Sequence, residues 1–87
     1  MRSEITFIGR VQGVGFRATA HNLAASHGVT GWVRNEADGS VKLVAEAEED
    51  VLNAYLAELR ERLGDYIREV RATTSDATGR YAGFEIR

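Results

Sequence analysis

One glycine-rich stretch constrains this chain more than any other feature: Gly9-Arg10-Val11-Gln12-Gly13-Val14-Gly15-Phe16-Arg17. It interrupts an apolar, strand-like run, Ile5 to Ile8, and leads into a helix-like run that begins near Phe16. Glycine tolerates positive φ, which lets consecutive N–H groups turn toward one point. The unpaired amides of the following helix face the same point. The stretch therefore predicts a loop at a helix N-terminus that can bind a phosphate-like dianion.

Arg17 follows in the first turn of that helix and adds a planar, permanently charged side chain beside the loop. The candidate phosphate-binding residues are therefore Gly13, Val14, Gly15, Phe16 and Arg17. A tight strand-to-helix turn is the plain structural alternative, but it does not require an arginine in the first turn. The stretch also matches a dinucleotide-binding fingerprint, although a doubly wound fold needs more strands than 87 residues supply.

Composition limits the classes of protein that this chain can belong to. With 87 residues it is expected to form a single domain, residues 1–87, around one core. A net charge of −2 leaves no basic excess for nucleic acid or an anionic membrane. There is no cysteine for a disulfide or a thiolate site, and no apolar run near the roughly 20 residues of a membrane span. Because the N-terminus also lacks an apolar signal segment, we expect a cytoplasmic protein. We also expect it to act as a monomer.

Hydrophobic periodicity predicts the element order βαββαβ. Strands are expected at about residues 3–9, 29–34, 41–45 and 66–73, a short extra strand at 81–87, and helices at about 17–27 and between the acidic residues 48–50 and Gly64. The first strand is expected to be buried largely on both sides. Two helices in this order predict a ferredoxin-like α+β sandwich, an antiparallel sheet with both helices on one face.

Asn35 is expected at the end of the second strand, just before an Asp38-Gly39 hairpin turn. In an arbitrary protein, an asparagine at this place is a turn residue. In a βαβ unit, however, the first and second strands are expected to be parallel neighbours, which brings Asn35 beside the glycine loop. Its carboxamide carries a donor and an acceptor and can hold a water against a bound phosphate. Arg17 and Asn35 are therefore the candidate catalytic residues.

The remaining polar residues are expected to be structural. Glu46 and the acidic residues 48–50 predict a solvated entrance to the second helix, which suits its dipole. His21 and His27 are six residues apart and so do not share one helix face. No histidine or carboxylate stands at ligand spacing, so the sequence predicts no metal site and no cofactor.

Two blocks of sequence resemble the signatures of the acylphosphatase family. One is the glycine-rich stretch 9–17, and the other comprises Gly31-Trp32-Val33-Arg34-Asn35 and Asp38-Gly39-Ser40-Val41. They occur in the family's order and at its separation, and the resemblance covers nearly the whole chain. It implies metal-free hydrolysis of the carboxyl–phosphate anhydride of small acyl phosphates. On that pattern Arg17 binds the phosphate, Asn35 positions the water, and the 13–17 backbone cradles the phosphate. The Gly-Pro step common in the family after the second helix is absent, because the chain has no proline.

Two alternatives stay open from the sequence alone. A non-catalytic, regulatory anion-binding module on a ferredoxin-like scaffold would bind phosphate or sulfate at the loop without turnover. Acylphosphatase-like domains also occur at the start of larger carbamoyl-transfer maturation enzymes. A chain that starts at Met1 and ends on a strand argues against this second alternative. The expected partner is a small acyl phosphate substrate, with no nucleic acid and no membrane.

Overall fold

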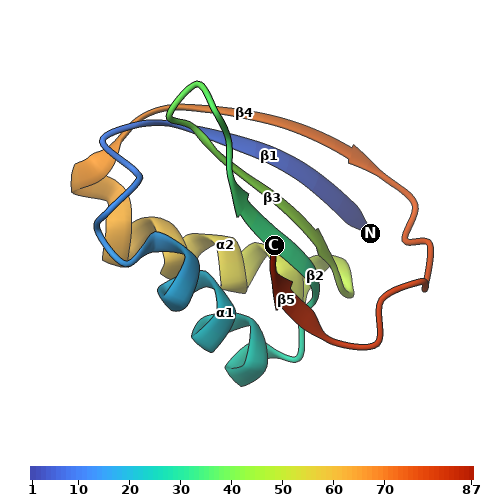
Figure 1. Cartoon of the computed structure of the whole chain (residues 1–87). Coiled ribbons are helices and arrows are strands. Elements are labelled where there is room, and N and C mark those ends of the chain that lie inside the picture. The colour runs from blue at the N-terminus through green and yellow to red at the C-terminus, as the bar shows by residue number, and fades with distance from the viewer.

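The computed structural model describes all 87 residues, as one sheet with two helices packed on it (Figure 1). In chain order the elements are β1 (Arg2–Gly9), α1 (Phe16–His27), β2 (Thr30–Asn35), β3 (Val41–Glu46), α2 (Glu49–Leu63), a 3₁₀ turn η1 (Gly64–Tyr66), β4 (Ile67–Ser75) and β5 (Phe84–Ile86). The strand order is β4-β1-β3-β2-β5. The first four strands in this order pair antiparallel, and β5 pairs parallel with β2. The predicted ferredoxin-like sandwich with a short extra strand is confirmed.

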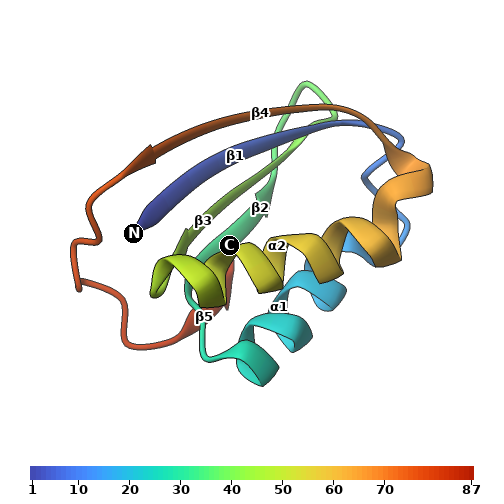
Figure 2. The same ribbon diagram turned by 180° about the vertical axis from the view of Figure 1, so that it is seen from behind.

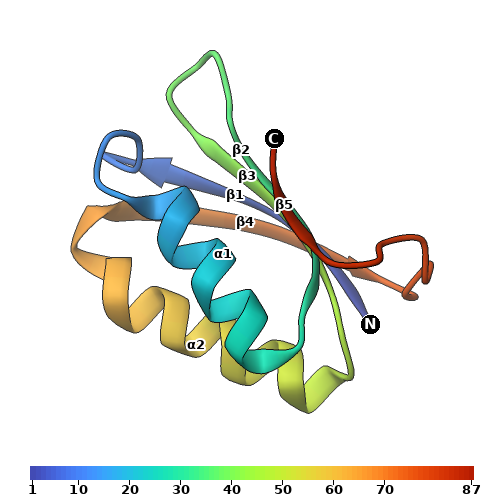
Figure 3. The ribbon, with the colours of Figure 1, turned by 60° about the horizontal axis from the view of Figure 1, so that its bottom comes forward.

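Both helices lie on one side of the sheet, and the other side is uncovered (Figure 1, Figure 2). Figure 3 shows α1 and α2 lying beside each other across that face. The Tyr55 hydroxyl of α2 donates a hydrogen bond of 2.9 Å to the carbonyl of Ala20 in α1, and burial raises the pKa of Tyr55. A hydrogen bond and a buried ring thus tie the two helices together. Neither helix has both the length and the apolar sequence that crossing a membrane requires.

Burial of β1 differs from the prediction. Ser3, Ile5 and Phe7 are buried on the helix side, whereas the residues that alternate with them are only half-buried. The prediction of burial on both sides was wrong because helices cover only one face of this sheet. Thr6 and Ile8 therefore lie on the uncovered face, where partial exposure of an apolar side chain is ordinary.

Glycines end the two helices in different ways. Gly28, with φ of 71°, ends α1 in the left-handed conformation, as predicted. Gly64 follows the last residue of α2 but keeps right-handed helical angles, with φ of −57°. The chain then tightens into η1 before β4 begins. This turn, which contains no proline, connects α2 to β4.

The strands β1 and β2 run in the same direction but are not neighbours, so that part of the prediction was wrong. The strand β3 lies between them and pairs antiparallel with both. The glycine loop nevertheless reaches the end of β2, because it passes the start of β3. The side-chain amide of Gln12 donates hydrogen bonds to the carbonyls of Glu36 (2.8 Å) and Ser40 (3.0 Å). Gln12 thus fastens the loop to the β2–β3 hairpin, next to Asn35.

Glu46 holds the segment that leads to β5. Because β4 and β5 lie at opposite edges of the sheet, residues 76–83 must cross its whole width (Figure 1). The Glu46 carboxylate accepts hydrogen bonds from the backbone N–H groups of Thr78 and Gly79, both at 3.0 Å, and from the Thr78 hydroxyl at 2.7 Å. Arg2 donates a further hydrogen bond of 3.0 Å. Glu46 is only 4% exposed, so its predicted place in a solvated helix entrance was wrong.

Replacing Glu46 is expected to weaken the fold and change its acid stability. Burial disfavours the charged form, but the hydrogen bonds from Thr78, Gly79 and Arg2 outweigh it and lower the pKa of Glu46 from 4.5 to about 2. A carboxyl with a lowered folded-state pKa stabilises the fold above its unfolded-state pKa, and this stabilisation is lost as the pH falls from about 4.5 to about 2. Glu46→Gln should lower the free energy of unfolding at neutral pH by about 2 kcal/mol, because the amide keeps an acceptor but loses the charge.

Urea unfolding over this pH range measures both effects. The matched control is Glu48→Gln, since Glu48 is exposed. We expect the control to change the free energy of unfolding by less than about 0.5 kcal/mol. Equal losses in the two variants would contradict the role assigned to Glu46.

Candidate active site

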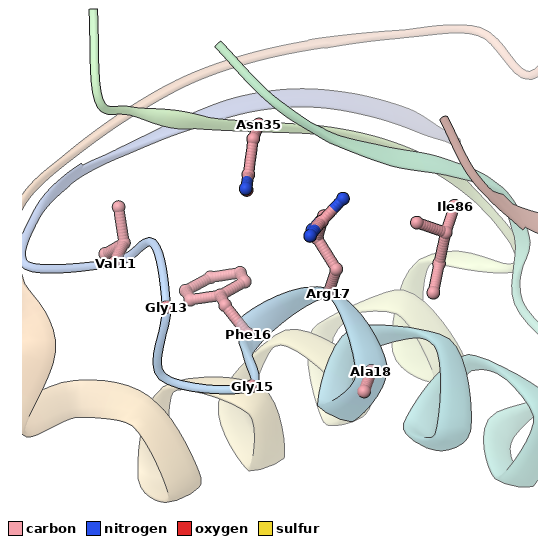
Figure 4. Close-up of a pocket in the computed structure, with 8 residues that line it drawn as sticks. All are labelled: Val11, Gly13, Gly15, Phe16, Arg17, Ala18, Asn35 and Ile86. Carbon is pink, nitrogen blue, oxygen red and sulfur yellow. The ribbon is translucent and has the colours of Figure 1, made fainter.

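A pocket of about 260 Å³ opens between the loop after β1, the start of α1, and the ends of β2 and β5 (Figure 4). Its lining residues are Val11, Gly13, Gly15, Phe16, Arg17, Ala18, Asn35 and Ile86. They come from a loop, a helix and two strands that are far apart in the sequence. The fold gathers four of the five candidate phosphate-loop residues and both candidate catalytic side chains at this one place.

The loop backbone is shaped by two glycines in the left-handed region. Gly13 has φ of 78° and Gly15 has φ of 80°. No N–H group of residues 13–18 donates a hydrogen bond within the chain, and the first that does is that of Thr19, to the carbonyl of Gly15. An anion in the loop would therefore meet several free N–H groups and the positive end of the α1 dipole.

Arg17 extends from the first turn of α1 into the pocket, and its guanidinium lies on the same side of the loop as the Asn35 carboxamide (Figure 4). Its side chain is exposed, and none of the ion pairs in the chain includes it. The pocket also has no acidic lining residue. The site is thus locally electropositive, although the chain as a whole carries a net charge of −2.

Asn35 is the last residue of β2 and is half-buried. Its position is set by pairing with Val41 of β3 and by the next residue, because the N–H of Glu36 donates a hydrogen bond of 2.9 Å to the carbonyl of Ser40. The carboxamide of Asn35 points toward the glycine loop (Figure 4). A carboxamide carries both a donor and an acceptor, so the Asn35 side chain in the pocket lining can contact a ligand or a water.

Val14 is the one predicted loop residue that does not line the pocket. Its side chain is half-buried and packs against the core. Three lining residues were not predicted, and two of them, Val11 and Ala18, flank the loop in the sequence. The third, Ile86, reaches the pocket only because β5 pairs with β2, where Ile86 stands opposite Val33. No local pattern in the sequence signals that pairing.

The histidines have structural surroundings away from the pocket lining. His27 Nε2 lies 2.9 Å from Glu58 Oε1, which links the end of α1 to α2. His21 is exposed on α1, with its ring 6.3 Å from that of Phe84. The structure contains no group of three or more His, Cys, Asp or Glu side chains that could hold a metal ion.

Comparison with known proteins identifies the family. The family model described as Acylphosphatase matches residues 3–86. The chain belongs to the acylphosphatase family. A curated relative from Salinibacter ruber, named Acylphosphatase, is 44% identical over 80 residues, which are 91% of this chain and 84% of the relative. These matches identify the chain as a hydrolase of the acylphosphatase type, and they give no support to the non-catalytic anion-binding alternative.

Solved structures agree with this assignment. An acylphosphatase from Bacillus subtilis is similar to the chain with a TM-score of 0.89 and 28% identity, over 99% of this chain and 97% of that one. The chain is also similar to part of full-length HypF in its phosphate- and nucleotide-bound form, with a TM-score of 0.89 and 28% identity. That match covers 99% of this chain but 11% of HypF. The acylphosphatase fold therefore occurs both alone and within a much longer protein.

Proposed function

We propose that this chain hydrolyses small acyl phosphates to a carboxylate and inorganic phosphate in the pocket between the glycine loop and Asn35. The observation that carries the proposal is that free loop amides, an unpaired arginine and a carboxamide line one pocket in a member of this family. Each supplies something that phosphoryl transfer needs: a cradle for the anion, a positive charge and a group that orients water.

The phosphate group binds to the N–H groups of residues 13–17, and the Arg17 guanidinium binds two of its non-bridging oxygens. The free amides of the loop support this arrangement, as does the absence of any acidic lining residue that would repel the anion. A guanidinium fork matches two phosphate oxygens in geometry as well as in charge. Charge that develops on these oxygens in the transition state is stabilised by groups already in position.

Asn35 orients the attacking water and donates a hydrogen bond to the phosphate. The water oxygen forms a bond to phosphorus while the bond from phosphorus to the acyl oxygen breaks, and the carboxylate leaves with the bonding electron pair. A proton of the water passes to a phosphate oxygen. Because a carboxylate is a stable leaving group, orientation and charge stabilisation suffice without a strong general base.

The activity is expected to be independent of divalent metal ions. Phosphate release from benzoyl phosphate should proceed at the same rate with excess EDTA as without it, since Arg17 supplies the positive charge and the loop amides supply hydrogen bonds. Adding magnesium back is the control and should not raise the rate. Activity lost in EDTA and restored by magnesium would overturn the metal-free mechanism. Phosphate binding without any turnover would favour the regulatory anion-binding module instead.

We further propose that the chain acts as a monomer in the cytoplasm. The loop amides, Arg17 and Asn35, which carry the proposed reaction, all belong to the same chain. A chain without cysteine is compatible with a reducing compartment. Sedimentation analysis at assay concentrations tests the oligomeric state, and activity that rises with self-association would contradict the monomer.

A further inference from the structure

Ile86 is an unusual apolar residue in this structure. It is 47% exposed, although isoleucine is among the most frequently buried residue types. It lines the pocket together with three other apolar residues, Val11, Phe16 and Ala18. None of these side chains can bind phosphate. Because Ile86 lines the same pocket as the anion-binding loop, its exposed side chain is placed to contact a part of the substrate other than the phosphate.

The strand β5 holds Ile86 firmly. Backbone hydrogen bonds join β5 to β2 on both sides of it, from the N–H of Gly31 to the carbonyl of Gly83 (2.9 Å) and from the N–H of Arg87 to the carbonyl of Val33 (2.8 Å). The segment before β5 is itself held by the buried carboxylate at the end of β3. Ile86 is thus a fixed wall of the pocket.

The position of Ile86 relative to Asn35 suggests which part of the substrate it contacts. In the close-up, the Arg17 guanidinium lies between the Asn35 and Ile86 side chains (Figure 4). In phosphoryl transfer the attacking and leaving oxygens stand roughly in line on opposite sides of phosphorus. With the water held by Asn35, the acyl group points toward Ile86 and Ala18.

We infer that Ile86 and Ala18 form an apolar subsite for the acyl group, which favours acyl phosphates with an aromatic or branched aliphatic body over those with a small or acidic one. The inference rests on the proposed function, because it takes the water from Asn35 and the phosphate from the loop. An apolar body gains by leaving water against Ile86. The one charged lining residue, Arg17, is engaged by the phosphate.

The test compares kcat/KM for benzoyl phosphate with kcat/KM for acetyl phosphate in the wild type and in Ile86→Ala. The variant should lower the benzoyl-to-acetyl ratio by about fivefold or more, because the phenyl ring loses its wall, and should change kcat/KM for acetyl phosphate by less than about twofold. Comparing ratios removes the different intrinsic reactivities of the two substrates. Inhibition by inorganic phosphate should stay unchanged, since the phosphate site is intact.

Two further variants separate a subsite from a general disturbance. Glu85→Ala alters the same strand at an exposed residue outside the pocket lining, and should leave the ratio unchanged. Ile86→Lys should lower the benzoyl-to-acetyl ratio of kcat/KM. It should raise the succinyl-to-acetyl ratio, because the new cation meets the free carboxylate of succinyl phosphate. If Ile86→Ala slows both substrates equally, the subsite is refuted while the proposed function stands. If the wild type hydrolyses neither substrate, the proposed function fails and the subsite with it.

Discussion

Arg17→Gln is expected to lower kcat/KM for benzoyl phosphate by about 10³-fold or more and to abolish competitive inhibition by inorganic phosphate. Arg17 is the only charged residue that lines the pocket, and it has no carboxylate partner in the chain. In the proposed mechanism the substrate therefore depends on Arg17 for a positive charge and for two hydrogen bonds at once. Glutamine keeps a donor but loses the charge and the fork.

The matched control for this prediction is Arg10→Gln. Arg10 belongs to the same glycine-rich stretch and is exposed, but it does not line the pocket. The variant removes the same charge but no contact with the pocket. It should therefore change kcat/KM by less than about threefold, which is the part due to long-range attraction. Comparable losses in the two variants would mean that net charge, and not contact with the phosphate, explains the effect.

Asn35→Ala is expected to lower kcat by about 10²-fold or more while leaving inhibition by inorganic phosphate nearly unchanged. In the proposed mechanism the carboxamide acts mainly on the attacking water, which matters for the transition state more than for binding of the phosphate. Initial rates at saturating substrate, together with a phosphate inhibition constant, measure the two quantities separately. The loop amides and Arg17 remain in place to bind the product.

Asn53→Ala is a suitable control for this second variant, because Asn53 is an exposed asparagine on α2 outside the pocket lining. It should leave both constants unchanged. A different split in Asn35→Ala, with weaker phosphate inhibition and an unchanged kcat, would assign Asn35 to ground-state binding. The water-orienting role would then be wrong.

Local sequence patterns predicted the parts of the site that lie close together in the chain. Three glycines and an arginine in the first turn of a helix are enough to predict an anion-binding loop, because conformation and charge are both local there. The left-handed angles of Gly13 and Gly15 agree with this reasoning. The two helices and the Asp-Gly hairpin were predictable for the same reason.

Topology predicted that Asn35 would lie near the glycine loop, but other features that depend on long-range pairing could not be read from the sequence. Ile86 enters the pocket through parallel pairing of a three-residue strand, β5, which carries too little pattern to reveal its partner. The buried state of Glu46 depends on a segment some thirty residues later in the chain, whereas its acidic neighbours suggest a solvated helix start. Gln12 belongs to the recognised stretch, but its acceptors lie in the hairpin, so its fastening role appears only in three dimensions.

The hydrogen bonds of Glu46 and Gln12 also connect the fold with the site. Glu46 fixes the segment that crosses the sheet, and that segment delivers β5 with Ile86 to the pocket. Gln12 fixes the distance between the glycine loop and the hairpin that follows Asn35. Hydrogen bonds made by residues outside the pocket lining thus help to hold both sides of the pocket in place.

The central claim is that Arg17, Asn35 and the glycine loop bind one phosphate together. An NMR titration of ¹⁵N-labelled protein with inorganic phosphate tests it most directly, because it follows backbone and side-chain N–H groups at the same time. The amides of residues 13–17, the Arg17 side chain and the Asn35 carboxamide should shift together with one dissociation constant. Shifts of the loop amides with the Asn35 carboxamide unmoved, or shifts gathered elsewhere on the chain, would contradict it.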